Sequence, residues 1–280
     1  MLDLSTNDDP YPAFTGDAEF NTALAHLPTR PWYQELKHLT RLRHLTVSEG
    51  WLYPASLQEL GDLPELESLS IVPGPLDEFD YMFDTNPVLP NGAFRQLTEL
   101  SMLGLEGFGM GTILDVTEMS RKITVMKLEL CFDDVEANKQ YDEFDRLFTG
   151  LGHALCLREL HISPSFRSEQ GEHPAMLYDT MEIMGPHPSL EHIHIGGIRI
   201  NKESRRICHS IRDLASIWPN VRTLSMPSQH ASIRDLEAFA TLPCLRHLTV
   251  NLNLKHPALP SFAAHARTAR AQSVPSARIS

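Results

Sequence analysis

A six-residue pattern of apolar residues returns through most of this 280-residue chain. It reads apolar, two variable residues, apolar, one variable residue, apolar, as in "LRELHI" at 157–162 and "LEHIHI" at 190–195. The pattern occurs eight times, at 42–47, 66–71, 97–102, 125–130, 157–162, 190–195, 221–226 and 245–250. A repeat of about 20 to 50 residues is typical of solenoids, in which each unit buries its apolar face by stacking on the next.

The pattern and its spacers predict alternating strands and helices. Apolar and other residues alternate in the last four positions of the pattern, which is the period of a strand with one buried face. The spacers at 142–155, 203–218 and 232–242 show helical spacing of apolar residues instead. In the first of these spacers, one stripe is formed by Phe144, Leu147, Phe148 and Leu151. Strands joined by short links through helices are expected to run parallel, with right-handed crossovers.

Proline marks the return from helix to strand. Four prolines stand two residues before a pattern begins: Pro64, Pro188, Pro219 and Pro243. Proline cannot continue a helix, and it favours extended backbone in the residue before it. Each of these helices is therefore expected to end just before the next strand begins.

The pattern resembles the "L-x-x-L-x-L" of the leucine-rich-repeat family over residues 42–254. The resemblance implies an α/β fold, a leucine-rich-repeat solenoid (horseshoe) with a parallel concave sheet and helices on the convex side. Family members usually carry Asn or Cys three residues after the last leucine, and in this chain only Asn253 does. The chain is therefore similar to the irregular, long-repeat type that bears helices.

Two longer stretches, "SLQELGDLPELESLSI" at 56–71 and "WPNVRTLSM" at 218–226, resemble the repeat region of fungal F-box proteins. Such proteins join a ubiquitin ligase through an N-terminal three-helix F-box and hold a substrate with their repeats. The F-box itself is not found, because "ALAHLPTRPWYQELKHL" at 23–39 has its Leu-Pro but not the rest of the motif. The resemblance implies a non-enzymatic protein-binding module and, more specifically, the substrate-recognition part of an SCF-type ubiquitin ligase with a Skp1-type adaptor as partner. A GTPase-activating leucine-rich-repeat protein, a plain scaffold with no ligase link and a degenerate gene product stay open as alternatives.

Charge and apolar content divide the chain into three parts. Residues 1–41 are expected to form an acidic leader and an N-terminal cap, and residues 42–254 the solenoid. Residues 255–280 contain four basic residues and no acidic one, and they lack apolar periodicity. They are therefore expected to be a basic disordered tail. The long stretches at 73–92 and 163–174 are expected to be loops between repeats.

Several classes of function are disfavoured by composition. The net charge of −12 argues against a nucleic-acid partner, because such binding requires a clustered basic surface. No run approaches the ~20 apolar residues of a membrane span, and the first residues lack the features of a secretory signal. The four cysteines are far apart and form no C-x-x-C pair. A cytoplasmic or nuclear protein without a membrane partner is therefore expected.

The residues between the apolar positions are expected to point out of the concave sheet face. The pattern aligns Glu129, His161 and His194 in one row across the strands, and it aligns Lys127, Glu159 and His192 in the row before. Since rigid solenoids usually bind their ligands on such a face, a protein partner is expected there. The candidate partner-binding residues are Glu129, Glu159, His161, His192 and His194.

No catalytic residue, metal or cofactor is assigned. Neighbouring strands lie ~4.8 Å apart, so that His161 and His194 could share a zinc ion with a carboxylate. However, the repeat itself dictates this spacing, and the histidines are expected to be free of metal. The stretch "GLEGFGMGT" at 104–112 lacks both the G-x-G-x-x-G spacing and the lysine of a P-loop. It is expected to be a flexible loop between repeats.

Overall fold

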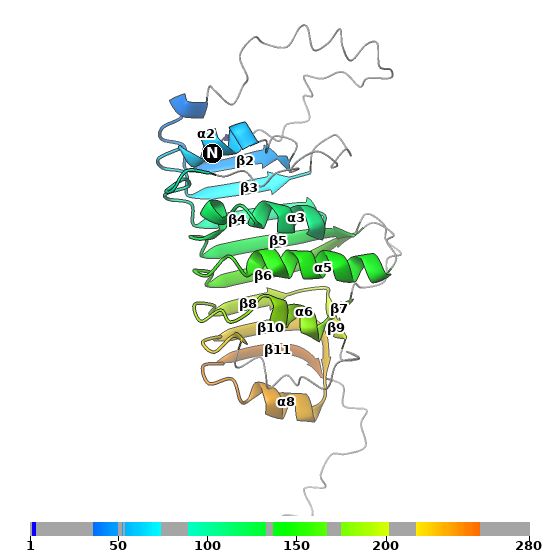
Figure 1. Cartoon of the computed structure of the whole chain (residues 1–280). Helices are drawn as coiled ribbons and strands as arrows, with labels where there is room; N and C mark the ends of the chain where they lie inside the picture. Colours follow the sequence, from blue (N-terminus) through cyan, green and yellow to red (C-terminus); the bar gives the residue numbers. More distant parts are fainter. Residues whose placement is uncertain are drawn as a thin grey trace, which may run out of the picture.

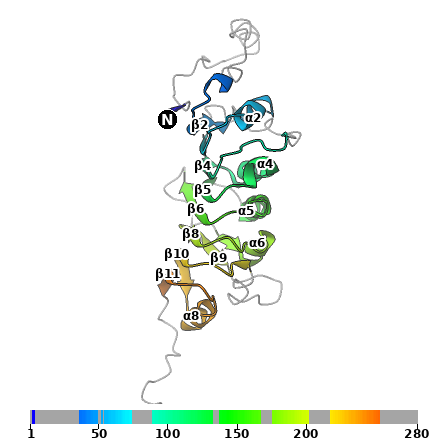
Figure 2. The same cartoon turned by 90° about the vertical axis from the view of Figure 1, so that its left-hand side faces the viewer.

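The computed structural model describes residues 2–3, 36–49, 52, 54–73, 89–132, 137–166, 175–201 and 217–252. A single parallel sheet runs along the molecule, and the helices lie along one of its faces (Figures 1 and 2). Its nine strands follow the order β1-β2-β3-β4-β5-β6-β8-β10-β11. The chain thus adds one strand after another to the same edge, as a solenoid does, and the predicted leucine-rich-repeat fold is confirmed.

Eight strands of this sheet carry the eight repeats. They are β2 (His44–Ser48), β3 (Ser68–Val72), β4 (Glu99–Leu105), β5 (Val125–Phe132), β6 (Glu159–Phe166), β8 (His192–Ile195), β10 (Thr223–Ala231) and β11 (His247–Leu252). The short strand β1 (Leu2–Asp3) pairs with β2 at the outer edge. Two further strands, β7 (Ala175–Leu177) and β9 (Arg199–Asn201), form a separate parallel pair.

The helices stand between successive strands of the sheet. They are α2 (Pro54–Gly61), α3 (Gly107–Leu114), α4 (Thr117–Ser120), α5 (Ala137–Leu151), α6 (Tyr178–Ile183) and α8 (Ile233–Phe239). The helices predicted at 142–155 and 232–242 are confirmed by α5 and α8. Most of the third, at 203–218, lies outside the described residues, as do residues 255–280 and most of the stretches 1–41, 73–92 and 163–174.

The core lies between the sheet and the helices. Leu160 and Ile162, the last two apolar positions of their repeat, are each 1% exposed. The helical stripe predicted on α5 is fully buried in the same core, and its members are Phe144, Leu147, Phe148 and Leu151. Burial of a side chain of this size contributes about 1.5 to 3 kcal/mol. The apolar residues of the pattern therefore form the core, because each repeat covers the apolar face of the one before.

The repeat at β5 begins two residues earlier than the sequence analysis predicts. Lys127 of β5, not Glu129, stands level with His161 of β6. The buried apolar positions of this repeat are Ile123, Met126 and Leu128, and the predicted frame of 125–130 is therefore wrong. Backbone hydrogen bonds between neighbouring repeats decide which of the two possible frames forms.

The carbonyl of the second pattern residue accepts two hydrogen bonds from the next repeat. Thr98 O accepts from the N–H groups of Thr124 and Val125, at 2.8 and 3.0 Å. Arg158 O likewise accepts from Glu191 and His192, both at 2.9 Å. This backbone ladder at the amino ends of the strands fixes the register between repeats, although the family's asparagine position is mostly filled by other residues.

Ion pairs reinforce the ladder near its C-terminal end. Arg158 Nη2 lies 2.9 Å from Glu191 Oε1, and Arg222 Nη1 lies 3.2 Å from Glu191 Oε2. The hydrogen bond from Arg158 is the main cause of a lowered pKa of Glu191, and partial burial opposes it. Three successive repeats are thus joined through one carboxylate.

The glycine-rich stretch at 104–112 is not the flexible loop that was expected. Residues 107–114 form α3, which packs on α5. An added Cβ at Gly111 would lie 2.7 Å from Arg146 O, and one at Gly150 would lie 2.8 Å from Leu114 Cβ. The glycines permit this close approach of the two helices, and packing outweighs the low helix propensity of glycine.

Candidate binding surface on the open face of the sheet

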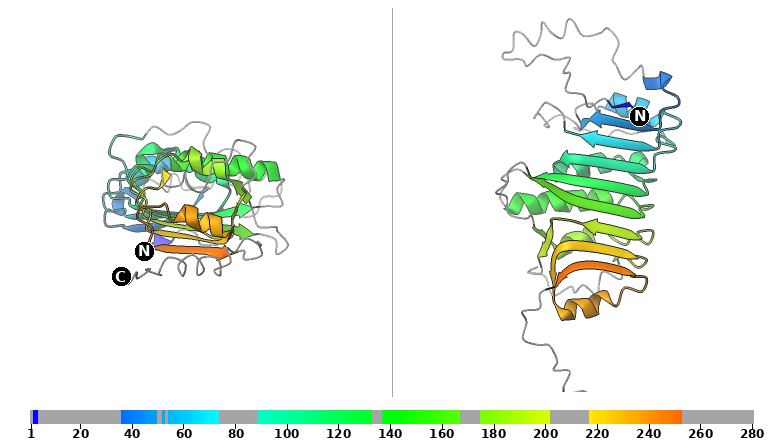
Figure 3. Two further views of the ribbon diagram at one scale, coloured as in Figure 1. Left: turned by 90° about the horizontal axis from the view of Figure 1, so that it is seen from below. Right: turned by 180° about the vertical axis from the view of Figure 1, so that it is seen from behind.

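The sheet has one face without helices, which we call the open face (Figure 3, right; Figure 2). The third and fifth residues of each repeat point to it, because the apolar positions between them are buried. The row of third positions is His44, Ser68, Glu99, Val125, Glu159, His192, Thr223 and His247. The row of fifth positions is Thr46, Ser70, Ser101, Lys127, His161, His194, Ser225 and Thr249. Within these two rows Val125 is the single apolar residue, so the open face is polar along its length.

A shallow hollow of about 340 Å³ lies on this face, over β6, β8 and β10. Its lining residues are Glu159, His161, His192, Ile193, His194, Thr223 and Ser225. Four of the five candidate residues are therefore brought together. Glu129 is not among the lining residues, because the shifted frame of β5 places it level with Ser163.

Two polar contacts organise the hollow. His161 Nε2 lies 2.6 Å from Glu159 Oε1 on the same strand, and His194 Nδ1 lies 3.1 Å from Ser225 Oγ on the next strand. The rings of His161 and His194 lie side by side, with centroids 5.8 Å apart and planes inclined by 37°. The side chains of His161 and Glu159 stay 41% and 39% exposed, so a ligand can reach them.

The surroundings of His194 favour the neutral over the charged form of its imidazole. Partial burial is the main cause of its lowered pKa, and the neighbouring His161 adds to the effect. Gly196 borders the ring, since an added Cβ there would lie 3.0 Å from His194 Nε2. A neutral imidazole has one donor and one acceptor, and it can therefore hydrogen-bond to either kind of ligand group.

The carboxylates in the two rows have positively charged or imidazole partners. Lys127 Nζ lies 2.6 Å from Glu99 Oε1, and Glu159 bonds to His161. Glu129 lies one step further along β5 and is half-buried. The centre of the open face is therefore less acidic than the sequence alone suggested.

The arrangement suits reversible binding better than covalent chemistry. Ser225 and His194 have the separation of a nucleophile and its base, but acyl transfer also requires donors for an oxyanion. The N–H groups of β8 and β10 lie in the plane of the sheet and are directed at neighbouring strands, so they do not converge above Ser225. Within the described ranges, no three His, Cys, Asp or Glu side chains are placed to hold a metal ion.

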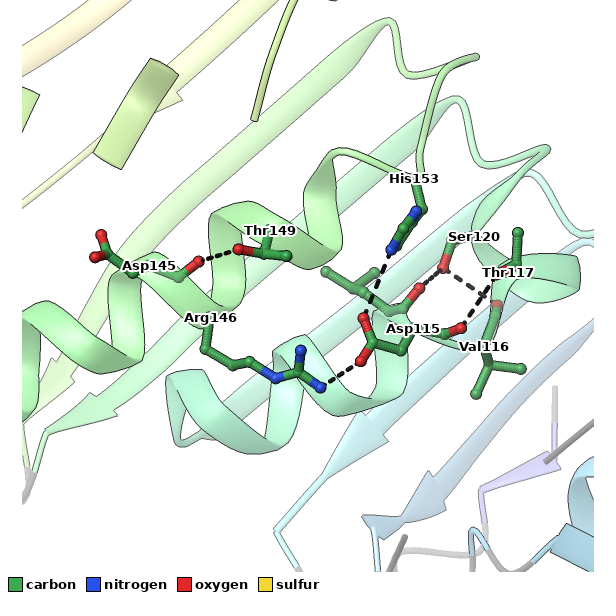
Figure 4. Close-up of polar contacts among 9 residues, drawn as sticks. Asp115, Val116, Thr117, Ser120, Asp145, Arg146, Thr149 and His153 are labelled. Atoms are coloured by element: carbon green, nitrogen blue, oxygen red, sulfur yellow. Dashed lines mark hydrogen bonds and ion pairs between the residues drawn. The ribbon is translucent and has the colours of Figure 1, made fainter. Parts of the chain in front are cut away.

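The helical side carries a polar cluster that sequence reasoning missed (Figure 4). Arg146 Nη2 of α5 donates to Asp115 Oδ2 at the end of α3, and His153 Nε2 lies 3.7 Å from Asp115 Oδ1. Ser120 Oγ donates to Leu114 O at 2.6 Å. Arg146 thus fastens the carboxyl end of α3 to α5, and Ser120 fastens it to α4. No local pattern signals them, since Asp115 and Arg146 are 31 residues apart.

No family model matches this chain, and no curated protein does. Among solved structures the chain is similar to an internalin from Listeria monocytogenes, at 14% identity and a TM-score of 0.34. The match covers 78% of this chain and 64% of that chain, so this chain spans less than two thirds of the internalin's length. Of the helices in the described part of the chain, none is long and apolar enough to cross a membrane. The repeats, the parallel sheet and the one-sided helices together give the chain the fold of a leucine-rich-repeat solenoid.

Proposed function

We propose that this chain is a non-enzymatic protein-binding module whose partner docks on the open face. One observation carries the proposal: the hollow over β6, β8 and β10 collects three imidazoles, two hydroxyls and a carboxylate on a regular sheet. Rigid solenoids bind ligands across such surfaces because the side chains are already in place before binding.

The proposed contact residues are Glu129, Glu159, His161, His192 and His194. Glu159 and His161 form the centre of the surface, and the exposed His192 lies beside Glu159 in the sheet register. The partner is proposed to present basic groups there. The chain outside residues 255–280 carries −16, and complementary charge both steers encounter and excludes wrong partners.

The test compares three forms of the full chain as bait. The wild type, the open-face variant Glu129→Lys with Glu159→Lys, and the helix-side variant Asp142→Lys with Glu237→Lys are used to capture partners, which are then purified and titrated by calorimetry. Both variants change the net charge by the same amount, and Asp142 and Glu237 are exposed on α5 and α8. A partner that binds the wild type and the helix-side variant, but not the open-face variant, supports the proposal. Equal loss in both variants contradicts it.

Asp145 is unsuitable for the helix-side control, although it is near Asp142 on α5. Its Oδ1 accepts a hydrogen bond of 2.6 Å from Thr180 Oγ1, and Thr180 is 1% exposed. Reversal at Asp145 would disturb the packing of α6 on α5, and loss of binding could then reflect loss of structure.

Within this class, we propose that the bound protein is a ubiquitin-ligase substrate, that a Skp1-type adaptor is a second partner, and that the chain acts in the cytoplasm or nucleus. The resemblance at 56–71 and 218–226 supports this finer proposal. Titration with a purified Skp1-type adaptor tests this finer proposal. If the adaptor does not bind while the open face still binds its partner, the chain is a plain scaffold with no ligase link. A GTPase assay tests the GTPase-activating alternative, which requires a free arginine. Arg146 does not meet that requirement, since it is paired with Asp115.

A further inference from the structure

A second hollow, which we call the edge hollow, lies where the chain leaves the helices and enters β4, β5 and β6. The turns that lead into these strands run along the left-hand side of Figure 1. The edge hollow measures about 400 Å³, and its lining residues are Asn91, Gly92, Glu118, Arg121, Lys122 and Cys156. It shares no residue with the hollow on the open face.

Two cations of this hollow are available to a ligand. The side chains of Arg121 and Lys122 are exposed. Within the described ranges, no hydrogen bond or ion pair engages either side chain. The one carboxylate of the hollow, on Glu118, is directed at the protein, since its Oε2 accepts from the N–H of Gly92 at 3.4 Å.

An exposed apolar side chain stands next to a lining residue of the edge hollow in sequence. Leu155 directly precedes Cys156, and its exposed fraction of 60% is the largest among the bulky apolar residues of the described ranges. It lies in a tight turn, where Leu155 N–H donates to His153 O at 3.0 Å. An isolated exposed leucine is ordinary, whereas apolar surface rimmed by polar residues is found at protein-binding sites.

We propose that the edge hollow binds an acidic peptide segment of a protein partner. Carboxylates of the segment pair with Arg121 and Lys122, Asn91 offers its amide, and an apolar side chain of the segment covers Leu155. Each exposed ion pair contributes little by itself, so the apolar contact and the two charges act together. This second surface does not depend on the open face, and the two can be tested separately.

The test uses a fluorescein-labelled peptide, Asp-Glu-Leu-Asp-Glu-Phe, and fluorescence anisotropy with the full chain. We expect Arg121→Glu with Lys122→Glu to weaken binding about tenfold or more, and Leu155→Ser to weaken it about threefold. Lys37→Glu with Arg41→Glu is the matched control. These two cations are also exposed, and their reversal changes the net charge by the same amount. The control is expected to change the affinity less than about twofold.

Three outcomes overturn the proposal. The first is a failure of the wild-type chain to bind the peptide. The second is equal weakening by both charge-reversal variants, which shows attraction to overall charge and not to a site. The third is stronger binding, by about tenfold, after Asp8→Asn, Asp9→Asn, Asp17→Asn and Glu19→Gln in the full chain, which identifies the acidic leader of this chain as the occupant. If the edge hollow is separate from the open face, His194→Ala leaves peptide binding unchanged. A failure of the edge-hollow proposal can therefore be told apart from a failure of the open-face proposal. Circular dichroism checks that each variant is folded.

Discussion

The imidazole rings of His161 and His194 lie side by side on neighbouring strands, with their centroids 5.8 Å apart. The pKa of His194 is lowered from 6.5, first by partial burial and second by His161. Because the pKa of His194 is lower in the folded chain, the unfolded chain binds more protons than the folded chain once the pH falls below about 6.5. Stability is therefore expected to be complete above about pH 6.5 and to fall as the pH drops through this range.

His194→Gln is expected to reduce this loss of stability on acidification, because it removes the group that must be protonated. Urea unfolding at pH 7.5 and at pH 5.5 measures the effect. His44→Gln serves as the control, since His44 is an exposed histidine at the other end of the sheet. An equal change in the pH dependence of stability in both variants would show that the His161–His194 pair does not cause the loss of stability on acidification.

The open face is expected to lose its partner when its carboxylates are reversed. Glu129→Lys with Glu159→Lys should leave the fold intact, because neither side chain is fully buried. Loss of a central contact typically costs about 2 kcal/mol or more of binding free energy. Calorimetric titration with the captured partner measures this change. Unaltered affinity in this variant, with loss in the helix-side variant, would move the binding site to the helices.

Gly111→Ala is expected to destabilise the fold, although alanine favours helix. The added Cβ would lie 2.7 Å from the backbone oxygen of Arg146, and backbone cannot rotate away. Overpacking of this kind costs about 1 to 3 kcal/mol. Chemical unfolding measures the cost, with Gln58→Ala on the exposed side of α2 as a control expected to stay within about 0.5 kcal/mol. A stabilised Gly111→Ala variant would mean that α3 and α5 are not in this close contact.

His187→Leu is expected to destabilise the chain more than His153→Leu. His187 is fully buried, and its ring nitrogens lie 3.1 Å from Gly185 O and 3.2 Å from Leu151 O. A neutral imidazole donates from one of its two nitrogens, so leucine would leave one of these carbonyls without its donor, at a cost of about 1 to 3 kcal/mol. His153 is 44% exposed and serves as the control in thermal unfolding. Similar melting temperatures for the two variants would show that His187 does not join the turn to α5.

The purified chain is expected to contain no stoichiometric zinc, since the spacing of His161, His192 and His194 follows from the repeat. Elemental analysis of protein purified without chelator measures the metal content. About one zinc ion per chain, lost in His194→Ala, would contradict this expectation.

Periodicity alone was sufficient to predict the eight repeat strands and, outside the repeat at β5, their apolar core positions and the residues of the open face. Its signal is local, because a period of two places alternate residues on opposite faces whatever the strand neighbours are. The prediction of α5 succeeded for the same reason, since Phe144 and Leu151 fall on one helical stripe. The sequence alone could therefore assign Glu159, His161, His192 and His194 to one surface.

Where the local sequence fitted more than one structure equally well, tertiary contacts decided which structure formed. Around β5, apolar residues at Ile123, Val125 and Met126 fit two frames, and the backbone bonds to Thr98 select the one that places Lys127 beside His161. The glycine-rich stretch became α3 because another helix lies close enough to require small residues. The pairs Asp115–Arg146 and Leu151–His187 join residues 31 and 36 positions apart. Local propensity acts over a few residues, whereas frame, close packing and long-range pairs depend on which segments meet, and that is decided only when the repeats stack.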